Sequence, residues 1–218
     1  MTSPAPSLRI TEIFHSIQGE STQAGRRCSF VRLTGCNLRC VWCDTAYAFE
    51  GGADVTISDI VRQVESHRTE LVLVTGGEPL AQEAVHDLMG TLLEAGKEVM
   101  IETGGSLALS RVDPRVRIIM DVKCPGSGME RMNRWENLSL LKPTDEIKFV
   151  VSDRGDYEWA RKAIRERRLA ESSTILLSPV FGVMDPRRLA EWILEDALEV
   201  RMQVQLHKWI WPPEMRGV

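Results

Sequence analysis

The sequence predicts an α/β protein, an incomplete (partial) parallel β/α barrel in which some crossover helices are shortened or missing. Seven short apolar runs are rich in β-branched residues, as strands covered on both faces must be. Amphipathic helical patterns separate several of these runs, and this alternation implies right-handed crossovers and a parallel sheet. Because the links 107–115 and 129–143 are too interrupted to hold long helices, we expect the barrel to be incomplete.

The expected elements follow one another in a regular order. The strands span residues 29–33, 71–74, 98–101, 116–120, 146–151, 174–177 and 202–206. Helical patterns cover residues 57–64, 85–93 and 157–168, and a fourth helix follows residue 185 and runs through residue 198.

Capping residues support three of these helices. Thr56 precedes the first helix and Asp59 follows three residues later, which is a capping-box pattern. Gly96 stands after the second helix, where a left-handed cap residue belongs. Asp185 before Pro186 gives the last helix an N-cap and a first-turn proline.

Composition describes an ordinary globular chain. Of its 218 residues, 43% are hydrophobic and 27% are charged, and we expect one domain over residues 1–218 with the first seven frayed. Because 27 Lys and Arg oppose 31 Asp and Glu, the chain lacks the basic excess of an electrostatic nucleic-acid binder. The sequence contains neither a membrane-length apolar run nor a signal-peptide pattern. We therefore expect a cytoplasmic protein with no nucleic-acid or membrane partner.

Polar motifs follow five successive predicted strands. The strands ending at residues 33, 74, 101, 120 and 151 are followed by TGCNLRCVWCDT, TGGEP, ETGG, DVKCP and SDRGD, respectively. In parallel α/β folds, ligands bind outside the carboxyl ends of the strands. The motifs therefore predict one shared active site at this end of the sheet.

Three cysteines lie in the first of these motifs. Cys36, Cys40 and Cys43 form C-x3-C-x2-C, and an odd total of five cysteines argues against a disulfide framework. Three thiolates can hold a 4Fe–4S cluster with one iron left open, whose open site the amino and carboxylate groups of S-adenosylmethionine can chelate. Zinc with a remote fourth ligand, or a disulfide with a spare thiol, are the alternatives. The isolated Cys28 and Cys124 are expected to be packing residues.

The cysteine spacing, with aromatic Trp42 before the last cysteine, resembles the radical SAM superfamily. TGGEP at 75–79 resembles its second motif, where glycine backbone can approach the methionine amino group closely. The resemblance implies a partial barrel of the radical SAM type, a 4Fe–4S cluster and S-adenosylmethionine. It also implies cleavage of S-adenosylmethionine to a 5′-deoxyadenosyl radical.

Further motifs narrow the resemblance. IFHSIQGE at 13–20, FVR at 30–32, CDT at 43–45, ETGG at 102–105 and QLHKW at 205–209 resemble the 7-carboxy-7-deazaguanine synthase family, from about residue 9 to the end of the chain. The resemblance implies a radical SAM carbon–nitrogen lyase of queuosine and deazapurine biosynthesis. Such an enzyme converts 6-carboxy-5,6,7,8-tetrahydropterin to 7-carboxy-7-deazaguanine with loss of ammonia.

The resemblance also implies roles for particular residues. The pterin would contact Ile17, Gln18, Gly19, Arg32 and Thr103, and Thr45 would bind Mg2+ together with the substrate carboxylate. The S-adenosylmethionine site would include Trp42, Cys43, Asp44, Gly105, Ser152, Asp153 and Arg154. Cys36, Cys40 and Cys43 would ligate the cluster. The implied partners are an electron donor such as flavodoxin or ferredoxin and, to cover an open sheet edge, a second copy of the chain.

Several residues have plainer alternative roles. Arg32 could form a structural ion pair, Thr103 could satisfy its own backbone, and Glu20 could be a solvated turn residue. Lys123 could pair with another residue rather than contact the cofactor. Ser21 stands where close relatives are expected to carry glycine, and serine suits that position only if its φ is negative.

Two other functions compete with the lyase. A glycyl-radical activase is also small and uses the same cysteine spacing, but IQGE and CDT would have no role in it. A zinc-stabilised binding module is the non-enzymatic alternative.

The sequence leaves the roles of two histidines open. His15 and His207 could each serve either packing or the active site.

Overall fold

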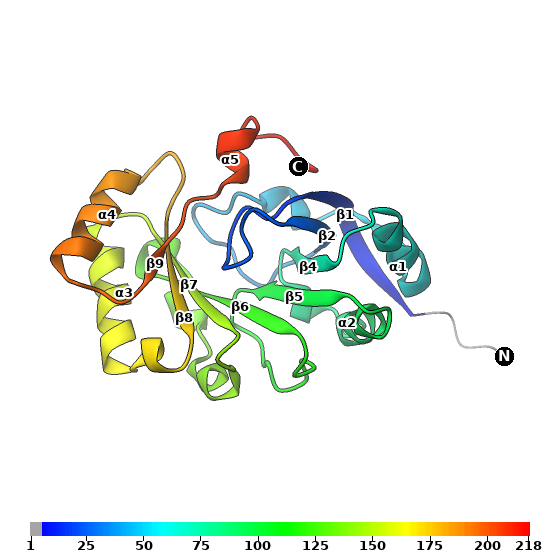
Figure 1. The fold of residues 1–218 in the computed structure, drawn as a ribbon, viewed down its shortest axis with the longest axis horizontal. Helices are drawn as coiled ribbons and strands as arrows, with labels where there is room; N and C mark the ends of the chain where they lie inside the picture. The colour runs from blue at the N-terminus through cyan, green and yellow to red at the C-terminus, as the bar shows by residue number, and fades with distance from the viewer. Residues whose placement is uncertain (1–5) are drawn as a thin grey trace.

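The computed structural model describes residues 6–218 and contains one open sheet of nine strands in the order β3-β1-β2-β4-β5-β6-β7-β8-β9 (Figure 1). The strands are β1 (Ser7–Ile17), β2 (Arg27–Leu33), β3 (Ala53–Thr56), β4 (Leu71–Gly76), β5 (Glu98–Thr103), β6 (Arg117–Val122), β7 (Glu146–Val151), β8 (Thr174–Pro179) and β9 (Arg201–Met202). From β2 to β9 neighbouring strands are parallel, whereas β1 is antiparallel to both of its neighbours. The predicted incomplete barrel is confirmed.

All seven predicted strands are present, but the last has only two residues, Arg201 and Met202, instead of the expected span 202–206. The sequence did not predict β1 and β3. β1 mixes polar and apolar residues because it lies at the antiparallel side of the sheet, where strands need not be apolar on both faces. Ser7 pairs with Thr56, so the chain is not frayed at residue 7, and residues 1–5 lie outside the described residues.

Four helices cover the outside of the sheet: α1 (Ile57–Ser66), α2 (Val85–Glu94), α3 (Arg154–Glu166) and α4 (Pro186–Glu195) (Figure 1). The predicted N-caps are confirmed, since the Thr56 side chain accepts a hydrogen bond from the Asp59 backbone and Asp185 accepts one from the Arg187 backbone. A fifth, short helix, α5 (His207–Ile210), lies near the C-terminus. No helix among residues 6–218 is both long and apolar enough to cross a membrane.

The two interrupted links contain no α-helix. The chain passes from β5 to β6 without one, and from β6 to β7 it forms only short 3-10 turns at Pro125–Ser127, Glu130–Met132 and Trp135–Leu140. These links leave the outer face of the central strands partly covered by 3-10 turns. The prediction of missing crossover helices is confirmed.

The sheet separates two apolar regions. The larger one lies between the outer face of the strands and the helices, and includes Val31, Val74, Ile101, Leu88 and Tyr157. The smaller one lies on the inner face and consists of Cys28, Phe30, Leu71, Leu73, Met100 and Ile119, with Phe14 packed against them. Side chains alternate between the two faces of a strand, so every second residue faces inward. In several strands, the inward-facing residue that follows these apolar ones toward the carboxyl end is polar.

The gap in the barrel is covered by two segments that touch each other. The β1–β2 loop, 18–26, meets the C-terminal segment 203–211 through three hydrogen bonds, one of which runs from Gln205 Nε2 to Glu20 Oε1 (2.9 Å). The Leu206 N–H donates to the Gly19 carbonyl (3.0 Å), and the Ser21 N–H donates to Gln203 Oε1 (2.8 Å). Ser21 has φ of 70°, so the condition under which serine suits this position, a negative φ, is not met.

Candidate active site

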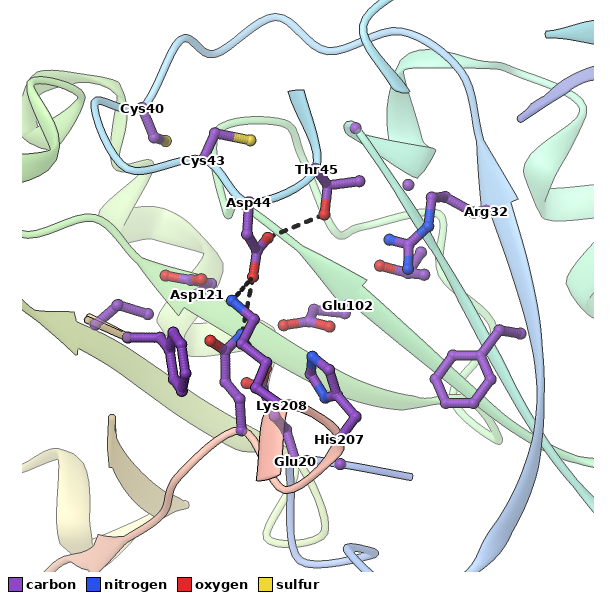
Figure 2. Close-up of a pocket in the computed structure, with 18 of the residues that line it drawn as sticks. Glu20, Arg32, Cys40, Cys43, Asp44, Thr45, Glu102, Asp121, His207 and Lys208 are labelled. Carbon is purple, nitrogen blue, oxygen red and sulfur yellow. Dashed lines mark hydrogen bonds and ion pairs between the residues drawn. The ribbon is translucent and has the colours of Figure 1, made fainter. Parts of the chain in front are cut away.

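A cavity of about 600 Å³ opens at the carboxyl ends of the parallel strands. Its walls come from β1, β2, the cysteine loop, the ends of β4 to β8 and the C-terminal segment. Figure 2 shows side chains from these elements pointing into the same space, among them Arg32, Cys43, Thr45, Glu102 and Lys208. Four of the five predicted strand-end motifs thus share one cavity, whereas SDRGD at 152–156 does not line it.

The cysteine loop forms one wall of the cavity. Cys36, Cys40 and Cys43 are free thiols, partly buried, and all three line the cavity. Burial raises the pKa of each thiol above its ordinary value, and the neighbouring cysteines raise those of Cys40 and Cys43 further. Cys28 and Cys124 are buried in the two apolar regions instead, which confirms their expected packing role.

Asp44 and Thr45 connect the cysteine loop to the C-terminal segment. Thr45 Oγ1 donates to Asp44 Oδ1 (2.9 Å), while Lys208 Nζ (2.8 Å) and Gln205 Nε2 (2.9 Å) donate to Asp44 Oδ2 (Figure 2). Burial acts to raise the pKa of Asp44, but Lys208, Gln205 and Thr45 outweigh burial and hold that pKa well below its usual range. Asp44 is therefore an ionised group that fixes the C-terminal segment against the cysteine loop.

Arg32 comes from β2, which β4, β5 and β6 separate from β7 in the sheet. Its Nε donates to Glu12 Oε1 (2.7 Å), and the Tyr47 hydroxyl donates to the same oxygen (2.8 Å). The Arg32 side chain is 16% exposed and lines the cavity. The structural ion pair is thus present, and the guanidinium still faces the space in which a ligand would bind.

The loop after β1 supplies the residues assigned to the pterin. Ile17, Gln18 and Gly19 all line the cavity. Gln18 is 3% exposed, and its Nε2 has no hydrogen-bond partner among the described residues. A buried amide without a partner is costly, so Gln18 offers a donor to a bound ligand. His207 lines the cavity beside Gly19, whereas His15 lies away from it, near His67.

Thr103 is tied to the motif after β4. Its hydroxyl donates to both oxygens of Glu78 (2.9 Å each), and the N–H groups of Leu80 and Gly104 donate to the same carboxylate. Burial raises the pKa of Glu78. The Thr103 hydroxyl thus donates its proton to Glu78, although Thr103 also lines the cavity.

The structure also reveals a buried charged cluster that the sequence analysis missed. We call Glu20, Glu102, Asp121, Lys123 and Lys148 the inner charged cluster. Lys148 Nζ contacts Glu20 (3.0 Å), Glu102 and Asp121 (3.5 Å), and Lys123 Nζ lies 3.1 Å from Asp121. Glu20 is therefore not a solvated turn residue, and Lys123 forms the ion pair that was its alternative role. The available signal was a charged residue at an inward position of an apolar strand, as in EVMIET, RIIMDV and EIKFVV.

Four residues assigned to S-adenosylmethionine do not line the cavity in this structure. Gly105 lies one residue beyond its wall. Ser152 Oγ donates to Asp156, Asp153 caps α3 by accepting from the Asp156 backbone, and Arg154 pairs with Glu158. Trp42, Cys43 and Asp44 do line the cavity.

Comparisons with known proteins agree with the motifs. Residues 30–193 match the Radical SAM superfamily. The chain is 48% identical to the 7-carboxy-7-deazaguanine synthase of Chlorobaculum tepidum, with 100% of each chain covered. The chain belongs to the 7-carboxy-7-deazaguanine synthase family. It is also 46% identical to the family member from Koribacter versatilis, covering 97% of this chain and 100% of the relative.

The fold agrees with a solved structure as well. The crystal structure of QueE from Escherichia coli superimposes with a TM-score of 0.76 at 23% identity, covering 92% of this chain and 95% of that one. As a radical SAM enzyme, the family member described here uses a 4Fe–4S cluster and S-adenosylmethionine. Among residues 6–218, no three His, Cys, Asp or Glu side chains already form a closed metal cage. The three free thiols on one cavity wall nevertheless fit a cluster held by three cysteines, because thiolates are the usual ligands of iron–sulfur clusters.

Proposed function

We propose that the chain converts 6-carboxy-5,6,7,8-tetrahydropterin to 7-carboxy-7-deazaguanine with loss of ammonia, a step of queuosine and deazapurine biosynthesis. The observation that carries the proposal is that the IQGE loop, the CxxxCxxC loop and the C-terminal QLHKW segment border one cavity. These are the motifs that separate the family from other radical SAM proteins. A glycyl-radical activase would have no use for the IQGE and CDT residues that line this cavity.

The chain's own residues bind and orient the substrate in this proposal. Arg32 would pair with an anionic group of the pterin, and the Gln18 amide would donate to its edge. Ile17, Gly19 and Thr103 would complete the pterin site. When bound, the cluster and S-adenosylmethionine supply the radical that takes hydrogen from the substrate and later returns it. The protein's tasks are to position the two ligands and to exclude water from them.

The cofactors would be held by groups on the cysteine-loop side. Cys36, Cys40 and Cys43 would ligate the cluster, and Trp42 and Asp44 would border S-adenosylmethionine. Gly105, Ser152, Asp153 and Arg154 remain candidates for that site only if the ligand extends beyond the cavity wall. The hydrogen bonds of Ser152, Asp153 and Arg154 within α3 and its cap would then orient the loop that meets the ligand.

The proposal includes a magnesium ion that Thr45 would bind. The Thr45 hydroxyl lines the cavity and uses its proton in the bond to Asp44, so its oxygen lone pairs are available to a hard cation that keeps several waters. In Thr45→Val, which retains the shape, we expect at least about tenfold lower turnover and a lost magnesium response, with unchanged iron content. Thr45→Ser is the matched control and should keep the magnesium response. Equal magnesium dependence in Thr45→Val would remove the metal from this site.

The wider assignments also remain proposals. We propose a single radical SAM core domain, a cytoplasmic location, an electron donor such as flavodoxin or ferredoxin, and a homodimer. The free edge of β3 at the end of the sheet supports the homodimer, because unpaired strand edges are usually covered.

One anaerobic experiment tests the central proposal. Reconstituted protein should contain about four irons per chain and, given reductant, S-adenosylmethionine, magnesium and the carboxypterin, should form the deazaguanine chromophore. Iron binding excludes the zinc-stabilised module, and pterin turnover excludes the activase. An iron-loaded protein that cleaves S-adenosylmethionine but leaves the pterin unchanged would refute the proposed substrate.

A further inference from the structure

Two glutamates from different parts of the chain share one buried lysine inside the cavity. Lys148, on β7, has a side chain only 6% exposed. It contacts Glu20 from the β1–β2 loop and Glu102 from the end of β5, and it also lies 3.5 Å from Asp121 on β6. Glu20 and Glu102 both line the cavity and are labelled in Figure 2.

The surroundings of the two carboxyls differ. Burial acts to raise the pKa of Glu20, but Lys148 and the Gln205 amide outweigh burial and hold that pKa below its ordinary value. Burial raises the pKa of Glu102 above its ordinary value despite Lys148, and the charges of Glu20 and Asp121 add to this effect. Neighbouring carboxyls with separated pKa values are the usual arrangement for acid–base chemistry. Lys148, whose pKa is raised well above its usual value by the carboxylates around it, stays an ammonium.

Three other acidic side chains that line the cavity, Glu12, Asp44 and Glu78, already have partners within the protein. Glu12 accepts from Arg32 and Tyr47, and Asp44 is held by Lys208 and Gln205. Glu78 is fully buried beneath Thr103. Lys148 engages Glu102 through Oε1, which leaves Oε2 of this cavity-lining carboxyl for a ligand.

Loss of ammonia requires a proton transfer that none of the residues assigned above performs. The proposed reaction is redox-neutral overall, because the hydrogen taken from the substrate is returned. Removing ammonia then means that a C–H bond and a C–N bond break while a C=C bond forms. The proton from carbon must reach the departing nitrogen, and a positioned side chain makes such a transfer faster.

We propose that Glu102 is the catalytic residue that moves this proton, with Lys148 and Glu20 as positioning residues. The Glu102 carboxylate takes the proton from the ring carbon, and the C–H electron pair forms the new C=C bond. The C–N pair leaves with nitrogen, and Glu102 then gives its proton to that nitrogen, which departs as ammonia. Carboxylate is regenerated and no other reactant is consumed. The inference rests on the proposed function, since it concerns the final step of that reaction.

The test follows the radical step and the ammonia step separately in the reconstituted enzyme. In the proposed reaction the radical takes hydrogen from C6 of the pterin, so carboxypterin deuterated at C6 transfers deuterium into S-adenosylmethionine in the radical step. Ammonium is measured in the same single-turnover sample. For Glu102→Gln we expect ammonium release to fall by at least about 100-fold and deuterium transfer to stay within about threefold of the unaltered enzyme. Glu102→Asp keeps the charge that Lys148 needs for folding, and it should slow ammonium release by at least about tenfold, with deuterium transfer preserved.

Glu98→Gln is the matched control, because Glu98 lies on the same strand but pairs with Arg26 at an exposed position. It should leave both steps unchanged. Ammonium release at the unaltered rate in Glu102→Gln or Glu102→Asp would overturn the proposal. Equal losses of deuterium transfer and ammonium release would also overturn it, because Glu102 would then act only in binding or folding. If the unaltered enzyme forms no deazaguanine, the proposed function itself fails, which is a separate result.

Discussion

The backbone N–H of Leu206 donates to the carbonyl of Gly19 across the gap in the barrel, at 3.0 Å. The bond joins the loop after the first strand to the last segment of the chain, 187 residues later (206 − 19). Gly19 is buried, and a Cβ at this position would lie 2.3 Å from His207 Nδ1. The close approach therefore requires glycine, and it places His207 in the cavity wall.

Gly19→Ala should loosen the C-terminal segment. The added methyl group would displace His207, and α5 would lose its contact with the loop. We expect trypsin to cleave after Lys208 at least about fivefold faster than in the unaltered protein, because local opening controls cleavage. Mass spectrometry of a digestion time course measures the effect. Gly90→Ala is the control, since a Cβ at Gly90 meets nothing within 4 Å, and equal cleavage in both variants would contradict the prediction.

Ser21 does not have the negative φ that would suit a serine at its position. Its φ of 70° costs about 1 kcal/mol for a residue with a Cβ. The serine hydroxyl offsets part of this cost by accepting a hydrogen bond from the Gln23 N–H (2.9 Å). The Tm of Ser21→Gly should therefore equal or exceed that of the unaltered protein. Ser21→Ala keeps the strain and loses the hydrogen bond, so its Tm should be about 2–4 °C lower. A Tm of Ser21→Ala above that of Ser21→Gly would disprove the strain argument.

The five thiols should divide into two classes in the protein without its cluster. Cys28 is 0% exposed, and burial raises its pKa to about 12, so its thiolate fraction at pH 8 is on the order of 1,000-fold below that of a free thiol. Cys124 is 1% exposed. Iodoacetamide should modify Cys36, Cys40 and Cys43 in the folded chain, and the other two only in denaturant.

The same division should appear in iron content. Alanine at Cys36, Cys40 or Cys43 should prevent cluster assembly, whereas Cys124→Ala should retain the iron. Peptide mapping after alkylation and iron analysis are independent measurements. Retention of iron in Cys36→Ala together with its loss in Cys124→Ala would show that the ligands were assigned wrongly.

The sequence predicted the parallel strands because each is a short apolar run that must be covered on both faces. It did not predict β1, in which polar residues such as Glu12 and His15 interrupt the apolar pattern. Local patterns also cannot reveal that Leu206 meets Gly19, because that contact depends on the curvature of the whole sheet. The sequence did locate the cysteine loop and Gln18, because each belongs to a short motif whose residues are close together in the chain.

The inner charged cluster shows why the rest of the site was missed. Lys148 meets Glu20 and Glu102 from elements 128 and 46 residues away. Each charge looks like an isolated polar residue in an apolar strand until the strands are placed side by side. Arg32 is also a charged residue in an apolar strand, and applying that signal to Glu102, Asp121 and Lys148 would have predicted a charged inner face.

Arg32 provides the strongest test of the substrate site, because its two possible roles predict different kinetics. Its guanidinium pairs with Glu12 at 2.7 Å and also faces the cavity. In Arg32→Met, the half-buried Glu12 loses its cation, which should cost about 1–3 kcal/mol of stability. If Arg32 also binds the pterin, the KM for the carboxypterin should rise at least about tenfold. Cleavage of S-adenosylmethionine without pterin should persist, because the cysteine loop and TGGEP are unchanged.

The control is Arg26→Met, which removes an arginine paired with Glu98 at the surface. Surface ion pairs contribute little, so both its stability and its pterin kinetics should be close to those of the unaltered enzyme. Thermal melting measured beside pterin and S-adenosylmethionine kinetics separates the two roles of Arg32. A purely structural Arg32 predicts a lower Tm with a normal KM in the folded fraction, and this result would remove Arg32 from the substrate site. A raised KM together with undiminished cleavage of S-adenosylmethionine would assign Arg32 to the pterin site.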